Sequence, residues 1–199
     1  VYVYDWSTNI QQWSLVQYAV RYPNENTYLT SNNTLIKYQG DGGNVVIPDD
    51  LGITTIGESA FESNSTITSV VIPDGVMEIG QSAFMNCENL ASVSMPNTVT
   101  TIKEEAFFNS KLESVAIPNA VATIGTGAFG ACETLTAISV NSTNTAYSSN
   151  EGVLYDKSQS LLHTYPGGKT GTFALPATVT KINNEPFYGS NFAAVAKND

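Results

Sequence analysis

A short apolar pattern recurs along this chain at a nearly constant interval. An isoleucine is followed four residues later by alanine and then by phenylalanine, and in most copies a glycine follows the isoleucine. The phenylalanines of the five copies, the last of them degenerate, are Phe61, Phe84, Phe107, Phe129 and Phe187. They are separated by 23, 23, 22 and then 58 residues. A fixed period in the twenties predicts a solenoid, in which each coil contacts mainly its neighbours along the chain.

Each repeat has two halves, and each half predicts a short strand. In the first half, as in residues 112–118, buried aliphatics alternate with small polar residues up to a proline. Proline has no N–H to donate to a ladder, so it ends the strand. The second half, as in residues 76–80, places two more aliphatics inward before a glycine that we expect to permit the next bend. We therefore predict a mainly β, right-handed solenoid of about 23-residue repeats, with short helical or irregular segments and β-hairpin insertions.

The repeat also predicts how its largest side chains are packed. Stacked coils should place Phe61, Phe84, Phe107 and Phe129 in one buried column. Cys87 and Cys132 occupy equivalent positions two coils apart. Two strand spacings separate their Cα atoms by about 10 Å, whereas a disulfide needs about 7 Å or less. Both cysteines are therefore predicted to be buried free thiols.

Two segments interrupt the repeat, and both are predicted to be β-hairpins. Residues 153–155 and 161–165 flank a five-residue loop, and residues 28–30 and 34–38 flank residues 31–33. We divide the chain into an N-terminal cap region with the first hairpin module (1–43) and a solenoid (44–199) with a hairpin insertion at 141–171. Residues 1–26 do not match the repeat; we interpret them as a cap, the alternative being the edge of a preceding domain.

Composition excludes several functions. The chain carries a net charge of −10, and its eight Lys and Arg residues are too few to neutralise a nucleic-acid backbone. No run of about 18 apolar residues is present, so membrane insertion is not predicted. Only 13% of the residues are charged. A polar surface made of Ser, Thr, Asn and Gly favours an extracellular protein.

Residues suited to catalysis or metal binding are scarce. The single histidine, His163, has no second histidine or reactive cysteine in its motif, so it is predicted to be a structural residue of a strand. The adjacent acidic pairs Asp49-Asp50 and Glu104-Glu105 are predicted to lie on solvated turns. No paired-carboxylate cleft is indicated. We expect no enzyme activity, no cofactor and no metal.

The full motif resembles a known family. Residues 72–90 read Ile-Pro, Val, Ile-Gly, Ala-Phe, Cys and Leu at the spacing of the BspA-type leucine-rich repeat, and the resemblance covers about residues 44–197. The insertion with Gly152 and Gly168 is also similar to one common in that family. The resemblance implies a curved β-solenoid on a secreted or surface-anchored protein, with roles in adhesion to host proteins and to other cells. It implies no catalytic residues.

Two surfaces are candidates for binding. The outward face of the longer strands should be a smooth array of small residues that a protein, such as a host extracellular-matrix or cell-surface protein, covers; its candidate residues are Thr68, Ser69, Ser92, Ser94, Glu113, Ser114, Thr136 and Ser139. Small residues also suit a sheet that no partner touches. The second candidate is a glycan-binding set of hairpin tyrosines, which could instead pack the hairpins onto the solenoid; they are Tyr28, Tyr38, Tyr147, Tyr155 and Tyr165. A third hypothesis is a structural spacer.

Overall fold

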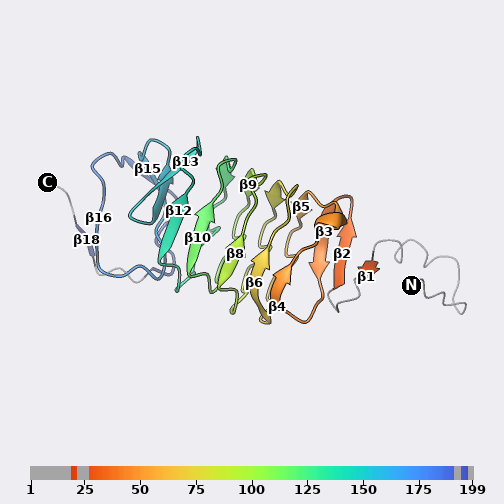
Figure 1. The fold of residues 1–199 in the computed structure, drawn as a ribbon. Helices are drawn as coiled ribbons and strands as arrows, with labels where there is room; N and C mark the ends of the chain where they lie inside the picture. Colours follow the sequence, from red (N-terminus) through yellow and green to blue (C-terminus); the bar gives the residue numbers. More distant parts are fainter. Residues whose placement is uncertain (1–18, 22–26, 191–193, 197–199) are drawn as a thin grey trace, which may run out of the picture.

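The computed structural model describes residues 19–21, 27–190 and 194–196. These residues form an elongated stack of β-coils, with β2 (Thr27–Ser31) near one end of the stack and β16 (Thr172–Ala174) near the other (Figure 1). No α-helix is present among the described residues, and a single 3-10 turn, η2 (Asp49–Leu51), follows the first strand–proline unit. The predicted β-solenoid is confirmed. The predicted cap at residues 1–26 lies outside the described residues except for β1 (Ala19–Arg21).

The longer strands of successive coils lie side by side and parallel (Figure 1). We call this layer the front sheet, and its strands are β4 (Gly43–Val46), β6 (Ile67–Val71), β8 (Ser92–Ser94), β10 (Ser114–Ile117) and β12 (Ala137–Val140). Equivalent repeat positions are paired, as Val70 with Val93 and Val115 with Ile138. Between β8 and β10 the ladder continues through the Glu113 N–H, which donates to the Ala91 carbonyl at 3.1 Å.

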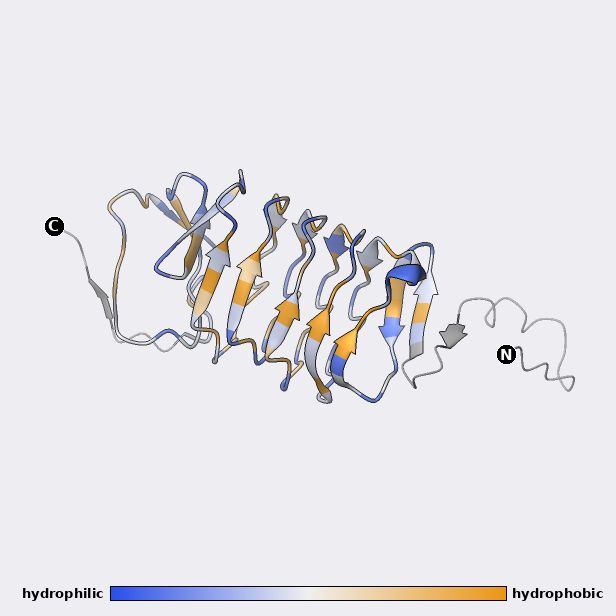
Figure 2. Ribbon diagram, viewed as in Figure 1, coloured by the Kyte–Doolittle hydropathy of each residue, from blue (hydrophilic) through white to orange (hydrophobic). Residues whose placement is uncertain are grey.

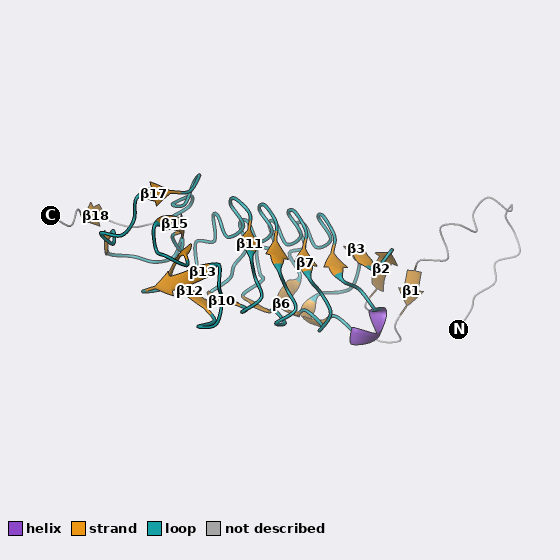
Figure 3. Cartoon of the chain, turned by 90° about the horizontal axis from the view of Figure 1, so that it is seen from above, coloured by secondary structure: helices purple, strands orange, loops and turns teal. Residues whose placement is uncertain are grey.

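A second layer, the back sheet, contains the Val-x-x-Ile halves of the repeats. Seen from above, it runs as a separate row of short strands along the stack (Figure 3). Its parallel strands are β5 (Thr55–Ile56), β7 (Glu78–Ile79), β9 (Thr101–Ile102) and β11 (Thr123–Ile124). At the N-terminal end it continues through β3 (Thr34–Tyr38), β2 (Thr27–Ser31) and β1, the last two pairings being antiparallel.

The core lies between the two sheets and the turns that join them. The predicted phenylalanine column is confirmed, because Phe61, Phe84, Phe107 and Phe129 are at most 1% exposed. Their ring centroids follow one another at 4.7, 5.1 and 5.5 Å, with nearly parallel planes. Tyr38 extends the column, 4.9 Å from Phe61. In β10 and β12, buried apolar residues alternate with residues that face outward, which is the pattern of a sheet with one buried face, and each strand of the front sheet carries apolar segments (Figure 2).

Both predicted hairpins are present, with shorter loops than expected. Strands β2 and β3 are joined by Asn32 and Asn33 alone, and both residues have positive φ, 49° and 59°, as a tight two-residue turn requires. In the second hairpin β14 (Val153–Asp156) continues through Asp156 before β15 (Leu161–Thr164), which leaves four loop residues. The Asp156 carboxylate organises this loop by accepting hydrogen bonds from Ser158, Ser160 and the Leu161 N–H.

The C-terminal part adds strands around that hairpin. A strand that the pattern did not predict, β13 (Tyr147–Asn150), pairs antiparallel with β14. Strand β15 pairs in parallel with β17 (Lys181–Ile182), and β16 (Thr172–Ala174) pairs with β18 (Ala194–Ala196). These elements enclose a second small core that contains Tyr155, Tyr165 and Phe173.

The repeat glycines have a different role from the one predicted. Gly57, Gly80 and Gly125 are not among the residues with positive φ, so the bend does not require them. A Cβ atom on Gly80 would lie 2.7 Å from the carbonyl oxygen of Ile56 in the preceding coil. The glycines therefore permit close approach of successive coils. Left-handed backbone occurs two residues later instead, at Ser59, Ser82, Glu105 and Gly127.

Candidate protein-binding face

The outward face of the front sheet brings the predicted protein-binding residues together. Seven of the eight are exposed, and Ser69 is half-buried. Parallel pairing places Ser69 beside Ser92. Backbone hydrogen bonds of 2.9–3.1 Å connect the next row, from Thr68 through Ala91 and Glu113 to Thr136. The rows therefore form one continuous surface, in which each residue is fixed by a parallel ladder.

This surface is nearly uncharged although the chain has a net charge of −10. Among the eight candidate residues, only Glu113 carries a charge at neutral pH. Part of its hydroxyl content is used internally: the Asn44 side-chain oxygen accepts hydrogen bonds from Thr68 and Ser69 at 3.1 and 2.9 Å. At one end two valines are exposed side by side, Val46 at 61% and Val71 at 41%. The repeat pattern did not single out Val46.

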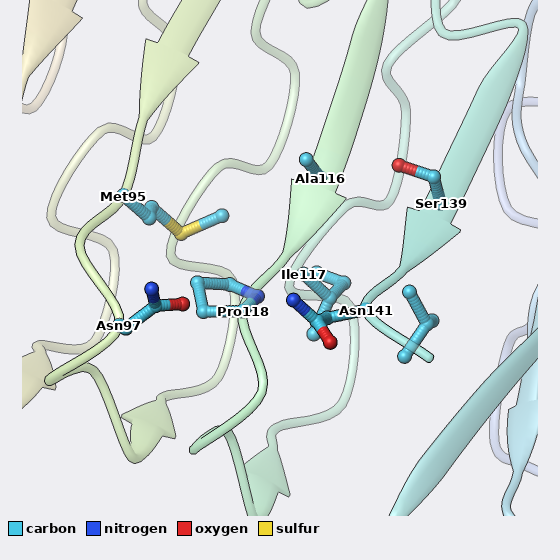
Figure 4. A pocket seen from close by; sticks show the side chains of 8 residues that line it. Met95, Asn97, Ala116, Ile117, Pro118, Ser139 and Asn141 are labelled. Carbon is cyan, nitrogen blue, oxygen red and sulfur yellow. The ribbon is translucent and has the colours of Figure 1, made fainter. Parts of the chain in front are cut away.

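A shallow depression of about 270 Å³ lies at the ends of the front strands β10 and β12 (Figure 4). Ala116 and Ser139, which belong to the outward rows, form one border. Asn97 and Asn141 lie on opposite sides of Pro118, with Met95 beside Asn97 (Figure 4). The remaining lining residues are Ile117 and Val140. The depression thus combines an apolar surface with amides on both sides, and no charged side chain lines it.

The tyrosines predicted as glycan contacts are mostly buried. Tyr28, Tyr38, Tyr155 and Tyr165 are at most 3% exposed. Burial, with smaller contributions from the charges of Glu151 and Tyr165, raises the pKa of Tyr155 to about 12. Their rings pack the hairpins onto the solenoid, which was the alternative interpretation, and they offer no ring face to a sugar. The half-buried Tyr147 also has an internal role, because its hydroxyl oxygen accepts the Ile124 N–H at 2.8 Å.

His163 has the surroundings of a structural residue. It is 6% exposed, its Nε2 lies 3.1 Å from the Ile124 carbonyl oxygen, and its Nδ1 lies 2.9 Å from Thr164 Oγ1. Burial lowers the pKa of His163, and the contact with Ile124 partly opposes that shift. With Tyr147, the ring therefore covers the polar groups on the edge of β11. That role could not be seen in the sequence, because His163 and Ile124 are 39 residues apart.

The two cysteines are buried and unbridged, as predicted. The Sγ atoms of Cys87 and Cys132 lie 3.1 Å from the carbonyl oxygens of Phe61 and Phe107, respectively. Burial raises the pKa of Cys87 to about 12, and burial also raises the pKa of Cys132. Because the thiolate is the reactive form, neither side chain is suited to nucleophilic chemistry.

Among the described residues, no three or more His, Cys, Asp or Glu side chains are grouped to hold a metal ion. No helix in the described ranges has the length and apolarity needed to cross a bilayer.

Comparison with known proteins identifies the family. The profile of the BspA type leucine-rich repeat region matches residues 46–159 with six copies of the repeat. The chain belongs to this family of leucine-rich repeat proteins. The matched range is narrower than the residues 44–197 suggested by the motif, and it ends before β15 and the degenerate last coil. No curated protein matches the chain.

Solved structures share the fold. A leucine-rich repeat protein from Eubacterium ventriosum is 27% identical, with a TM-score of 0.62 over 87% of this chain and 57% of that protein. A leucine rich cell surface protein from Faecalibacterium prausnitzii is 21% identical, with a TM-score of 0.60 over 90% and 70% of the two chains. The pneumococcal vaccine antigen PcpA is 17% identical, with a TM-score of 0.65 over 91% of this chain and 64% of that protein. The chain therefore spans between 57% and 70% of these structures.

Proposed function

We propose that this chain is a non-enzymatic binding region of a secreted or cell-surface protein, and that its front face adheres to a protein on a host or neighbouring cell. The observation that carries the proposal is the continuous, exposed and nearly uncharged array of residues on successive front strands. The proposed secreted or cell-surface location of the protein is supported by the family and by the similar protein described as a cell surface protein.

The front face has the properties of a preorganised contact surface. Its side chains are small and its backbone is held in parallel ladders, so binding requires little additional ordering. The exposed Val46 and Val71 provide apolar area at one end. At the other end, the depression beside Pro118 can take one apolar side chain of the partner, while the amides of Asn97 and Asn141 face its polar backbone. Apolar anchors surrounded by polar groups carry most of the energy in many interfaces.

Charge reversal on this face tests the proposal. The probe is a panel of purified extracellular-matrix and cell-surface proteins immobilised for surface plasmon resonance. Glutamate introduced at Ser92, Ser114 and Ser139 should abolish binding, because an unpaired carboxylate is costly to desolvate in an interface. The matched control is Thr123→Glu, an exposed position on the back sheet. Melting temperatures of all variants establish that they are folded.

Two outcomes would contradict the proposal. If the triple variant binds as the parent does and Thr123→Glu weakens binding, the contact surface is the back sheet. If no protein of the panel binds the parent, the remaining hypothesis is the structural spacer.

A further inference from the structure

A separate surface of the solenoid carries a partly exposed aromatic pair. The rings of Phe108 and Tyr188 have centroids 5.3 Å apart and are tilted by 43°. Phe108 is half-buried, whereas Tyr188 is 50% exposed. The two residues are distant in sequence, but the Ala131 N–H donates to the Tyr188 carbonyl at 3.0 Å, so the last coil stacks directly on the coil that contains Ala131.

Glycines explain why these rings meet. Gly130 lies between Phe108 and Tyr188 in the stack and contributes no side chain; a Cβ atom there would lie 3.1 Å from Phe108 Cδ2. Gly127, on the same turn, likewise has no side chain. A Cβ atom at Gly127 would lie 3.5 Å from Glu105 Cγ and 4.0 Å from Phe108 Cδ2. The Phe108 ring and the Glu105 side chain therefore lie against backbone that carries no side chains, of which Gly127 is half-buried and Gly130 is buried.

Hydrogen-bonding groups lie beside the rings. Asn109, the neighbour of Phe108, donates from Nδ2 to the Asn86 Oδ1 at 3.0 Å. Both asparagines have left-handed backbone, with φ of 52° and 58°. Within the described part of the chain, no hydrogen bond uses the side-chain Nδ2 of Asn86 or the Oδ1 of Asn109. One amide donor and one amide acceptor are thus held in place next to the aromatic pair.

We propose that this aromatic–amide patch, defined by Phe108, Tyr188, Asn86, Asn109 and Glu105, binds an uncharged sugar ring of a glycan. An aromatic face packs against the C–H face of a pyranose, and amide and carboxylate groups pair with its hydroxyls. The Glu105 carboxylate and the acidic chain disfavour sialylated or sulfated sugars. The patch uses none of the front-face residues, so this inference is independent of the proposed function.

The test uses defined oligosaccharides. The chain is titrated calorimetrically with cellotetraose, chitotetraose and sialyllactose. A neutral tetrasaccharide should bind, and Tyr188→Ala should weaken it by about tenfold through loss of one stacking ring. Ile182→Ala, which removes a 53% exposed side chain of the same coil, should leave the affinity unchanged. If Tyr188→Ala lowers the melting temperature, Asn86→Ala provides the second measurement and should also weaken binding.

The inference is overturned if neither neutral tetrasaccharide binds, if the affinity survives both Tyr188→Ala and Asn86→Ala, or if the chain prefers sialyllactose. Loss of binding to a protein on Tyr188→Ala, without any sugar binding, would assign the patch to a protein partner and would also reject it. The front-face variant Ser139→Glu separates the two sites, because it should leave sugar affinity unchanged.

Discussion

The ring of His163 meets the carbonyl of Ile124 at 3.1 Å, although 39 residues separate the two in sequence. Ile124 lies on β11, the last strand of the back sheet. The N–H of Ile124 donates to the hydroxyl oxygen of Tyr147. The rings of His163 and Tyr147 meet edge to face, with centroids 5.5 Å apart. Together they provide hydrogen-bond partners for the backbone groups of Ile124 at the edge of the back sheet. An unpaired strand edge exposes groups that pair with other chains, so this contact closes the back sheet where the insertion begins.

This contact predicts that stability depends on pH. Burial lowers the pKa of His163 from its ordinary value of 6.5. The unfolded chain therefore takes up a proton at higher pH than the folded chain, and the contribution of the neutral ring is fully present above pH 6.5 and is lost as the pH falls through the folded pKa. Urea midpoints should be lower at pH 5.5 than at pH 7.5. In His163→Gln, which does not titrate, the difference should shrink; an equal fall in both proteins would contradict the assignment.

The two cysteines should react only after unfolding. Burial raises the pKa of both thiols, that of Cys87 to about 12, and the neutral thiol is a poor nucleophile. In the absence of denaturant, a chromogenic disulfide reagent at pH 8 should label neither residue within the time that labels an exposed thiol. Labelling should follow the unfolding curve in urea, and single Cys87→Ala and Cys132→Ala variants assign each phase. Fast labelling of the folded protein would show that the thiols are accessible.

The column of phenylalanines should dominate local stability. Phe107→Ala removes a ring stacked between Phe84 and Phe129 at 5.1 and 5.5 Å, and we expect a loss of about 3–5 kcal/mol in the free energy of unfolding. The neighbouring Phe108→Ala, which truncates a half-buried ring, is the matched control and should cost less. Chemical denaturation measures both. Equal losses would mean that the column is not the core of the coil.

The repeat predicted the solenoid well because its signal is periodic. Equivalent residues face equivalent neighbours in every coil, so the phenylalanine column and the outward rows follow from spacing alone. Features that arise once were harder to predict. The Phe108–Tyr188 pair joins coils that the 141–171 insertion separates in sequence, and the depression beside Pro118 depends on how side chains of three coils meet. The tyrosines were ambiguous because one ring suits both a core and a binding surface.

Asn144, at the start of the insertion, has a structural role that the repeat could not predict. Asn144 follows Asn141 by three residues, as Val121 follows Pro118, so it occupies the position of a core valine. The structure buries it to 1% exposure. Its Nδ2 donates to the Pro118 and Val121 carbonyls at 2.8 and 2.9 Å, and its Oδ1 accepts the N–H groups of residues 146 and 147, each at 2.8 Å. The amide thus turns the chain out of the solenoid into β13.

Asn144→Val should therefore destabilise the protein even though it restores the repeat residue. The valine fills the same space but leaves the N–H groups of residues 146 and 147 without their acceptor and removes one donor from the carbonyls of Pro118 and Val121, of which only Pro118 keeps another, the Val121 N–H. We expect a loss of about 2–4 kcal/mol, since each buried unpaired polar group costs about 1–3 kcal/mol. Asn141→Ala, an exposed asparagine of the same segment, is the control and should cost less than Asn144→Val. Urea denaturation at neutral pH measures the free energy of unfolding of both variants. If Asn144→Val is as stable as the parent, the repeat, and not the amide, determines the path of the chain at this point.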